Sequence, residues 1–174
     1  MRNPNWNLAD RKFLLTNSKT VFKAFIIAIP HVDGGNSVLH NRDTLKQTWA
    51  GFHRASQTTY AAATFQFVGT IIKPDFARNQ AAAHEAMDRA RLQGANFVML
   101  FLEKKSTPAY STFKDLADRR YGMHSLCVVY NAKNHYSPQY WGNIAMKVNL
   151  KAGGINHTVD GVEQIMKDTL VLGA

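Results

Sequence analysis

Residues 104–151 read KKSTPAYSTFKDLADRRYGMHSLCVVYNAKNHYSPQYWGNIAMKVNLK, and this stretch decides the expected fold. It contains two helix-start signals, at residues 106–108 (STP) and 136–138 (YSP), where a hydroxyl residue precedes a proline suited to the first helical turn. An apolar run between them, residues 125–130, is typical of a buried strand. The stretch therefore predicts a helix, a strand and a second helix.

The chain before this stretch shows the same alternation. Runs rich in β-branched and aromatic residues predict strands over residues 21–30, 62–72 and 96–102. Apolar residues at helical spacing predict helices over residues 41–56 and 75–92. Strand and helix thus alternate four times, which predicts an α/β, Rossmann-like fold: a four-stranded, mainly parallel sheet with helices on both faces.

Each helix of the opening stretch carries polar side chains four residues apart, which puts them on one helix face. The pairs are Tyr110 with Lys114 and Lys147 with Lys151. We expect both faces to meet near helix starts and to bind a doubly charged anion, most simply a phosphate, close to the loop 104–108 that follows a strand end. The net charge of +9 fits a polyanionic partner, although from charge alone a solvated basic face is the favoured interpretation.

Length and composition limit the classes of protein. A chain of 174 residues with 45% hydrophobic content is typical of one globular domain. The longest apolar run, residues 24–30, is too short to span a membrane, so no membrane partner is expected. A single cysteine, Cys127, and a polar N-terminus without a secretory signal favour a reducing, cytoplasmic location.

Motifs of common catalytic sites are missing from the sequence. It has no GxxxxGK[ST] or GxGxxG loop, no HExxH and no GxSxG. We therefore expect no catalytic residue, no metal site and no cofactor. Asp115 and Asp118 are interpreted as a solvated helix face, and Cys127 as a buried structural cysteine.

Three segments resemble the MID domain of eukaryotic Argonaute proteins, in particular fungal proteins of the quelling type. They are PAYSTFK (108–114), YGMHSLCVV (121–129) and SPQYWGNIAMKVNLKAGGINH (137–157). The third is the most specific, because a pattern N-x-x-x-K-x-N-x-K-x-G-G-x-N is met by Asn143, Lys147, Asn149, Lys151, Gly153, Gly154 and Asn156. Clear similarity covers about residues 95–157.

The resemblance implies that the chain is part of a longer protein. Residues 1–19 would be a linker or lead-in, residues 20–157 the MID domain, and residues 158–174 the start of the PIWI domain. The chain would be a non-catalytic module of RNA silencing that binds the 5′-phosphate and first nucleotide of a small guide RNA, with the PIWI domain as its neighbour. Slicer carboxylates of the family belong to that PIWI domain.

Residue by residue, the resemblance implies two groups of ligand contacts. The 5′-phosphate would be bound by Tyr110, Lys114, Cys127, Lys147 and Lys151, with the tyrosine also stacking on the first base. The loop that senses that base would consist of Lys104, Lys105, Ser106, Thr107 and Pro108.

Two positions depart from the pattern of the family. Leu126 stands where animal relatives have a glutamine whose amide reaches the phosphate, so a backbone N–H near Cys127 would have to replace it. Lys105 stands where relatives often have glycine, which leaves the base preference open.

Two other classes of function remain compatible with the residues. One is a phosphate-handling enzyme of doubly wound fold, and the other is a protein-interaction module. Binding of a capped messenger 5′ end is less favoured, because one nearby tyrosine does not form the two-ring sandwich that suits a methylated base.

Overall fold

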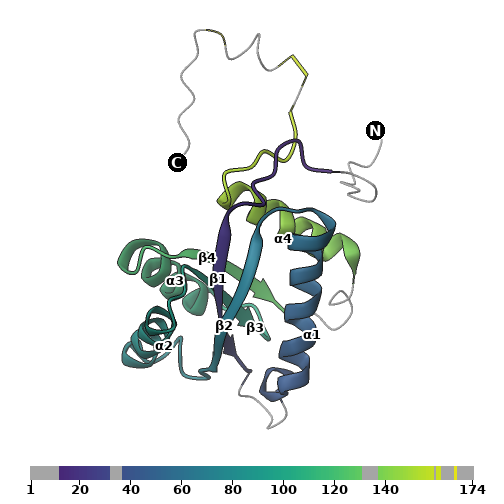
Figure 1. Ribbon diagram of the computed structural model, residues 1–174. Helices are drawn as coiled ribbons and strands as arrows, with labels where there is room; N and C mark the ends of the chain where they lie inside the picture. The colour runs from purple at the N-terminus through teal and green to yellow at the C-terminus, as the bar shows by residue number, and fades with distance from the viewer. Residues whose placement is uncertain (1–11, 32–36, 131–136, 159, 162–166, 168–174) are drawn as a thin grey trace.

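A four-stranded parallel sheet forms the centre of the molecule. The computed structural model describes residues 12–31, 37–130, 137–158, 160–161 and 167. The strand order is β2-β1-β3-β4, and each neighbouring pair is parallel (Figure 1). The strands are β1 (Val21–Ile29), β2 (Thr64–Ile72), β3 (Phe97–Leu102) and β4 (His124–Val129). The predicted Rossmann-like α/β fold is confirmed, and its strands match the predicted ones to within two residues.

Polar side chains cap the starts of the first three α-helices, whereas Ser137, at the start of the fourth, makes no side-chain capping hydrogen bond. The helices are α1 (Arg42–His53), α2 (Gln80–Leu92), α3 (Thr107–Lys114) and α4 (Pro138–Lys151), with short helical turns η1 (Val38–His40), η2 (Arg54–Thr59) and η3 (Asp115–Arg120). Asn41, Asn79 and Ser106 each accept a hydrogen bond from a backbone N–H in the first turn of the helix that follows. The second helix therefore starts at Gln80 instead of the predicted Asp75, because Asn79 is its cap and residues 75–79 form a turn.

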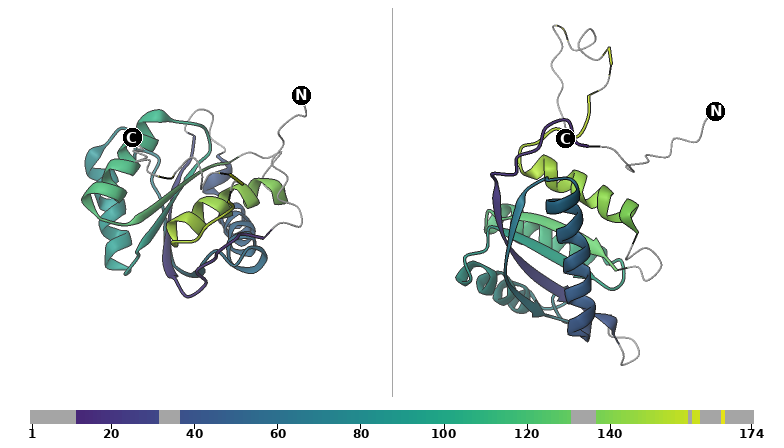
Figure 2. Two further views of the ribbon diagram at one scale, coloured as in Figure 1. Left: turned by 90° about the horizontal axis from the view of Figure 1, so that it is seen from above. Right: turned by 45° about the vertical axis from the view of Figure 1, so that its right-hand side comes forward.

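The helices cover the sheet in two layers, each with its own apolar core. Helices α1 and α4 pack on one face, and α2 and α3 pack on the other (Figures 1 and 2). Successive side chains of a strand point to opposite faces, so Phe22 and Ile26 of β1 enter the first core while Phe25 and Ile27 enter the second. Both faces of the sheet are thus covered, which explains why β3 is buried along its whole length.

The segment before β1 is joined to the segment after α4. Leu15 and Ile155 form an antiparallel bridge with backbone hydrogen bonds of 2.9 and 2.8 Å. Phe13 is buried and stacks on Tyr60 with ring centroids 4.9 Å apart. The described part of the expected lead-in, from residue 12 on, is therefore packed against the domain and contributes to it.

Candidate functional site at the edge of strand β4

The candidate side chains lie along β4, the outer strand of the sheet on the side away from β2. Helices α3 and α4 pack on opposite faces of the sheet, and each contributes lysines. The expectation that the lysines lie near helix starts is wrong: Lys114 is the last residue of α3, and Lys147 and Lys151 lie in the last turns of α4. Lys114 therefore lies within a helical segment that continues through η3 to Arg120, and Lys147 and Lys151 lie near the C-terminus of α4; all three lie alongside the strand and not beyond its carboxyl end.

Electrostatic coupling shows that the lysines of α3 and α4 are neighbours in space. Burial lowers the pKa of Lys151, and the positive charge of Lys114 lowers it further, while Asp118 opposes both effects. The charges of Lys114 and Lys147 both act on the thiol of Cys127 in β4. The two lysine-bearing helices thus converge on the same edge of the sheet. We call Lys114, Lys147 and Lys151 the basic cluster.

Asp118 and Ser125 contact the basic cluster through Lys114, although they were not among the site residues expected from the sequence. The ammonium group of Lys114 donates hydrogen bonds to Asp118 Oδ2 at 2.9 Å and to Ser125 Oγ at 2.5 Å, and Ser125 Oγ donates to Asp118 Oδ1 at 2.5 Å. Ser125 is buried at the start of β4, with 1% of its surface exposed. The four-residue spacing of Lys114 and Asp118 was the available signal. Asp118 is exposed, as expected, but it also bonds to Lys114 and Ser125, whereas Asp115 pairs with Arg119 and Arg120.

The surroundings of Asp118 keep it ionised. Burial alone would raise the pKa of this carboxyl group, but hydrogen bonds from Ser125 and Lys114 and the charges of Lys114 and Lys151 hold the pKa below its usual value. At neutral pH the cluster therefore contains one carboxylate among its ammonium groups.

The backbone N–H of Cys127 points to the open edge of the sheet. His124 and Tyr130 donate their N–H groups to carbonyls of Asn96 and Leu102, toward β3. Cys127 is three residues from each of them, and N–H directions alternate along a strand, so its N–H points away from β3. By contrast, Leu126 is buried in the core beneath α4 and presents no group to the edge. The backbone donor that would replace the family glutamine is therefore suitably placed.

A cavity of about 280 Å³ lies beside Tyr110, at the carboxyl ends of β3 and β4. Tyr110 is 46% exposed, and the cavity is lined by Leu102, Lys105, Ser106, Thr107, Tyr110, Cys127 and Val129. Three residues of the expected base-sensing loop therefore line a space next to the basic cluster. The other two residues of the loop do not line this cavity. Lys104 Nζ lies 3.4 Å from His31 Nε2, and Pro108 lies in the first turn of α3.

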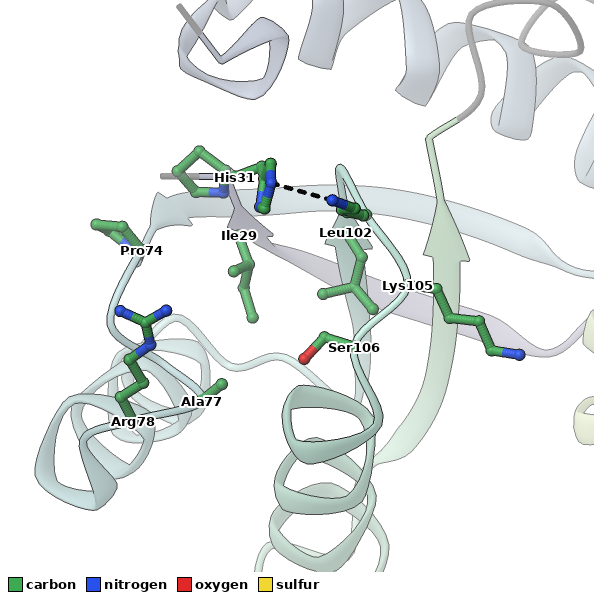
Figure 3. A pocket seen from close by; sticks show the side chains of 10 residues that line it. Ile29, His31, Pro74, Ala77, Arg78, Leu102, Lys105 and Ser106 are labelled. Atoms are coloured by element: carbon green, nitrogen blue, oxygen red, sulfur yellow. Dashed lines mark hydrogen bonds between the residues drawn. The ribbon is translucent and has the colours of Figure 1, made fainter. Parts of the chain in front are cut away.

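A second cavity, of about 240 Å³, lies on the other side of this loop, between the carboxyl ends of β1 and β3 (Figure 3). Ser106 and Arg78 border it from two different sides, whereas the side chain of Lys105 points away from it (Figure 3). Lys104 pairs with His31 at its rim. The loop after β3 thus separates two cavities, and Lys105 extends away from this one.

Asn149, Asn156 and Gly154 of the specific motif have a structural role. Asn149 is fully buried and donates hydrogen bonds to the Leu15 carbonyl and to Asn156 Oδ1, each at 3.0 Å. A Cβ atom on Gly154 would lie 2.5 Å from the Leu15 carbonyl oxygen and would collide with Asn149. These residues hold the turn after α4 against the lead-in, and this turn directly follows Lys151.

Comparison with known proteins identifies the class of fold. The structure resembles the crystal structure of the N. crassa QDE-2 AGO MID-PIWI domains, with a TM-score of 0.63 and 23% identity over 86% of this chain and 39% of that one. It resembles the Arabidopsis thaliana AGO5 MID domain with a TM-score of 0.62 and 18% identity, over 85% of this chain and 99% of that one. Kluyveromyces polysporus Argonaute with a guide RNA gives a TM-score of 0.70 and 19% identity, over 93% and 19% of the two chains.

Sequence comparisons point to the same family. Residues 97–174 match the model of the Piwi domain. A protein argonaute of Schizosaccharomyces pombe is 33% identical over 61 residues, which cover 35% of this chain but only 7% of that protein. The putative protein tag-76 of Caenorhabditis elegans is 32% identical over 62 residues, 36% of this chain and 6% of that protein. The chain therefore has the fold of Argonaute MID domains, and its sequence from residue 97 on is similar to the Piwi family, in agreement with the resemblance seen in its motifs.

The described residues contain neither a membrane-spanning helix nor a cluster of metal-ligating side chains. In that part of the chain, no helix is long and apolar enough to cross a membrane. Within the same residues, no group of three or more histidine, cysteine, aspartate or glutamate side chains could hold a metal ion.

Proposed function

We propose that this chain binds the 5′-phosphate and the first nucleotide of a small guide RNA, as a module of an Argonaute protein. The supporting observation is the convergence of α3 and α4 on the edge of β4, where the basic cluster lies next to the cavity beside Tyr110. Lysine ammonium groups from two helices suit a terminal phosphate, which carries nearly two negative charges. An exposed tyrosine at a cavity edge suits stacking on a base.

The phosphate would lie where Lys114, Lys147 and the backbone N–H of Cys127 all face the open edge of β4. Lys147 has an exposed side chain, and its charge reaches Cys127, so its ammonium group is available to a ligand. Lys105 and Thr107, in the cavity lining, would contact the first base. The structure of Kluyveromyces polysporus Argonaute contains a guide RNA, which fits a nucleic acid ligand for this fold.

We also propose that this domain binds its ligand without catalysing a reaction. Burial raises the pKa of the Cys127 thiol to about 11 despite the nearby charges of Lys114 and Lys147, so the thiol is protonated at neutral pH and is a poor nucleophile. The only carboxylate of the cluster, among the described residues, is bonded to Lys114 and Ser125. A binding role therefore explains the site better than a phosphate-handling enzyme.

The division of the chain follows from the same proposal. Residues 1–19 would be the lead-in, residues 20–157 the MID domain and residues 158–174 the start of a PIWI domain, which would be the partner within the same protein. Residues 159, 162–166 and 168–174 lie outside the described part. A guide-binding protein of this type is expected to work in the cytoplasm.

Substitution of Lys147 tests the proposed site with little risk to the fold. We expect Lys147→Ala to weaken binding of a nucleoside 5′-monophosphate about tenfold, the effect of losing one charge-assisted hydrogen bond. The melting temperature should not change, because the side chain is exposed. NMR titration of the 174-residue chain with the monophosphate, and with the nucleoside that lacks the phosphate, measures both affinities.

Lys46→Ala is the matched control. Lys46 is an exposed lysine of α1 that lies beside β2, at the opposite edge of the sheet. We expect this variant to bind the monophosphate as the parent chain does. Equal affinity of the parent and Lys147→Ala, or equal affinity for the nucleoside with and without phosphate, would contradict the proposed function.

A further inference from the structure

The carboxylate of Asp118 lies inside the candidate site and not beside it. It accepts hydrogen bonds from Lys114 and from the buried Ser125, and these two donors also contact each other. Two hydrogen-bond partners therefore fix its orientation: Lys114 in helix α3 and Ser125 in strand β4. Asp115, three residues earlier in the same helical turn, makes no such contact and pairs with Arg119 and Arg120.

In the free site, positive charges lie close together, and the negative charge of Asp118 reduces their repulsion. Lys114 and Lys151 come from different helices; burial lowers the pKa of Lys151, and the positive charge of Lys114 lowers it further. Asp118 is the neighbouring negative charge that acts on both lysines. It therefore takes the place of an anionic ligand while none is bound.

We propose that Asp118 is an internal counter-ion that stabilises the empty site and thereby limits its affinity for anions. This inference rests on the proposed anion-binding function of the basic cluster. A bound anion neutralises Lys114 and Lys151 in place of Asp118. The net gain on binding is therefore smaller, because the lysines already interact favourably with Asp118 in the free site. Removing the charge of Asp118 therefore raises the energy of the free state more than that of the bound state, and the anion binds more tightly.

The substitution Asp118→Asn removes the charge and nearly preserves the shape. The amide oxygen can still accept from Lys114 and the amide nitrogen can donate to Ser125 Oγ, so only the hydroxyl proton of Ser125 loses its acceptor. With sulfate as the probe, we expect the dissociation constant to fall about three- to tenfold, as expected for one charge near the protein surface acting on a dianion. The melting temperature of the free chain should fall by a few degrees.

Asp115→Asn is the matched control, because it removes the same charge from the same helical turn outside the cluster. We expect its sulfate affinity to change by less than about twofold. A weaker sulfate affinity of Asp118→Asn would overturn the proposal and would show that Asp118 serves to orient Lys114. An affinity increase of equal size in both variants would also overturn it, because the effect would then be one of net charge alone.

A measurement on the unsubstituted chain does not depend on how the variants fold. The ¹³C resonance of the Asp118 carboxyl group, followed against pH, should report a higher pKa with saturating sulfate than without it, because the anion draws Lys114 and Lys151 away from the carboxylate. The Asp115 carboxyl group should not change. An Asp118 pKa that is the same with and without sulfate would overturn the proposal.

The two proposals fail in different ways. If sulfate binds and shows the Asp118 effect, but a nucleoside 5′-monophosphate binds no better than sulfate, the counter-ion role stands and guide binding does not. If the monophosphate binds with the expected Lys147 dependence while Asp118→Asn leaves all affinities unchanged, guide binding stands and the counter-ion role is refuted.

Discussion

Cys127 lies beside two lysines whose charges would favour a thiolate, and its pKa is nevertheless raised to about 11. Burial is the cause. In the partly buried strand, the thiolate loses more favourable solvation energy than it gains from attraction to the charges of Lys114 and Lys147. The contribution of this residue to a ligand site therefore comes from its backbone N–H and from the shape of the cavity wall, and not from sulfur chemistry.

The raised pKa of Cys127 predicts a loss of stability in alkaline solution. An unfolded thiol has a pKa near 8.5, so the neutral thiol favours the folded state below that pH, and the advantage disappears as the pH rises toward 11. Between pH 7.5 and 10.5, the free energy of unfolding should fall in both chains, but the fall should be about 2 kcal/mol larger in the parent chain than in Cys127→Ala. Urea unfolding at both pH values measures this difference, and identical pH dependence in the two chains would contradict it.

At the scale of elements, the turn after α4 determines where Lys151 lies. Gly153 has a φ of +83°, a conformation that L side chains rarely adopt, and Gly154 lies against the Leu15 carbonyl and Asn149. Together with the side chain of Asn149, this turn ties the end of α4 to the lead-in. The motif therefore combines two lysines that face the candidate site with asparagine and glycine residues that position the last of them.

Gly154→Ala should disrupt this turn. A Cβ atom there would lie 2.5 Å from a backbone oxygen that cannot move without breaking the bridge to Ile155. We expect a loss of about 1–3 kcal/mol of stability, in the range of substitutions that overpack a core, and a weaker affinity for nucleoside 5′-monophosphates. Thermal unfolding and NMR titration test both effects.

Gly153→Asn is the control for that substitution. A Cβ atom at this position meets no atom within 4 Å, and asparagine tolerates a positive φ better than other side chains. We expect a loss of about 1 kcal/mol or less. Equal losses in the two variants would mean that backbone conformation, and not the close approach to Leu15, makes the turn sensitive.

At the scale of the whole molecule, residues far apart in the chain close the domain. The segment around Leu15 lies beside the segment around Ile155, as both views of the ribbon confirm (Figures 1 and 2). Asn17 also donates a hydrogen bond to the Ala152 carbonyl at 3.1 Å. Although residues 1–19 were expected to be a linker, their described part supports the helix that carries Lys147 and Lys151.

If the chain is shortened from its N-terminus, the loss of stability should therefore depend on the residue at which the shortened chain starts. A chain that starts at residue 20 loses the Leu15 bridge, the buried Phe13 and the Asn17 bond, so we expect it to lose about 3–5 kcal/mol of stability. A chain that starts at residue 12 keeps all three, so we expect it to be more stable than the chain that starts at residue 20 by this amount. Chemical denaturation compares the three chains, and equal stability of all of them would contradict this role of the lead-in.

The sequence by itself was sufficient to predict the type and order of the elements, because helix and strand periodicity and capping are properties of neighbouring residues. It was also sufficient to place Tyr110 with Lys114, and Lys147 with Lys151, on common helix faces, since four-residue spacing is local. The alternation of buried strands and helices then restricted the fold to a parallel sheet covered on both sides.

Only the tertiary structure decided how these faces meet. The candidate site lies along the edge of β4, because the packing of the helices brings Lys114 and the C-terminal turns of α4 there. The pairing of Asp118 with Ser125 depends on contacts between a helical turn and a strand, and the contact of Leu15 with Ile155 joins residues 140 positions apart. Such contacts arise from the packing of whole elements, which no local pattern in the sequence specifies.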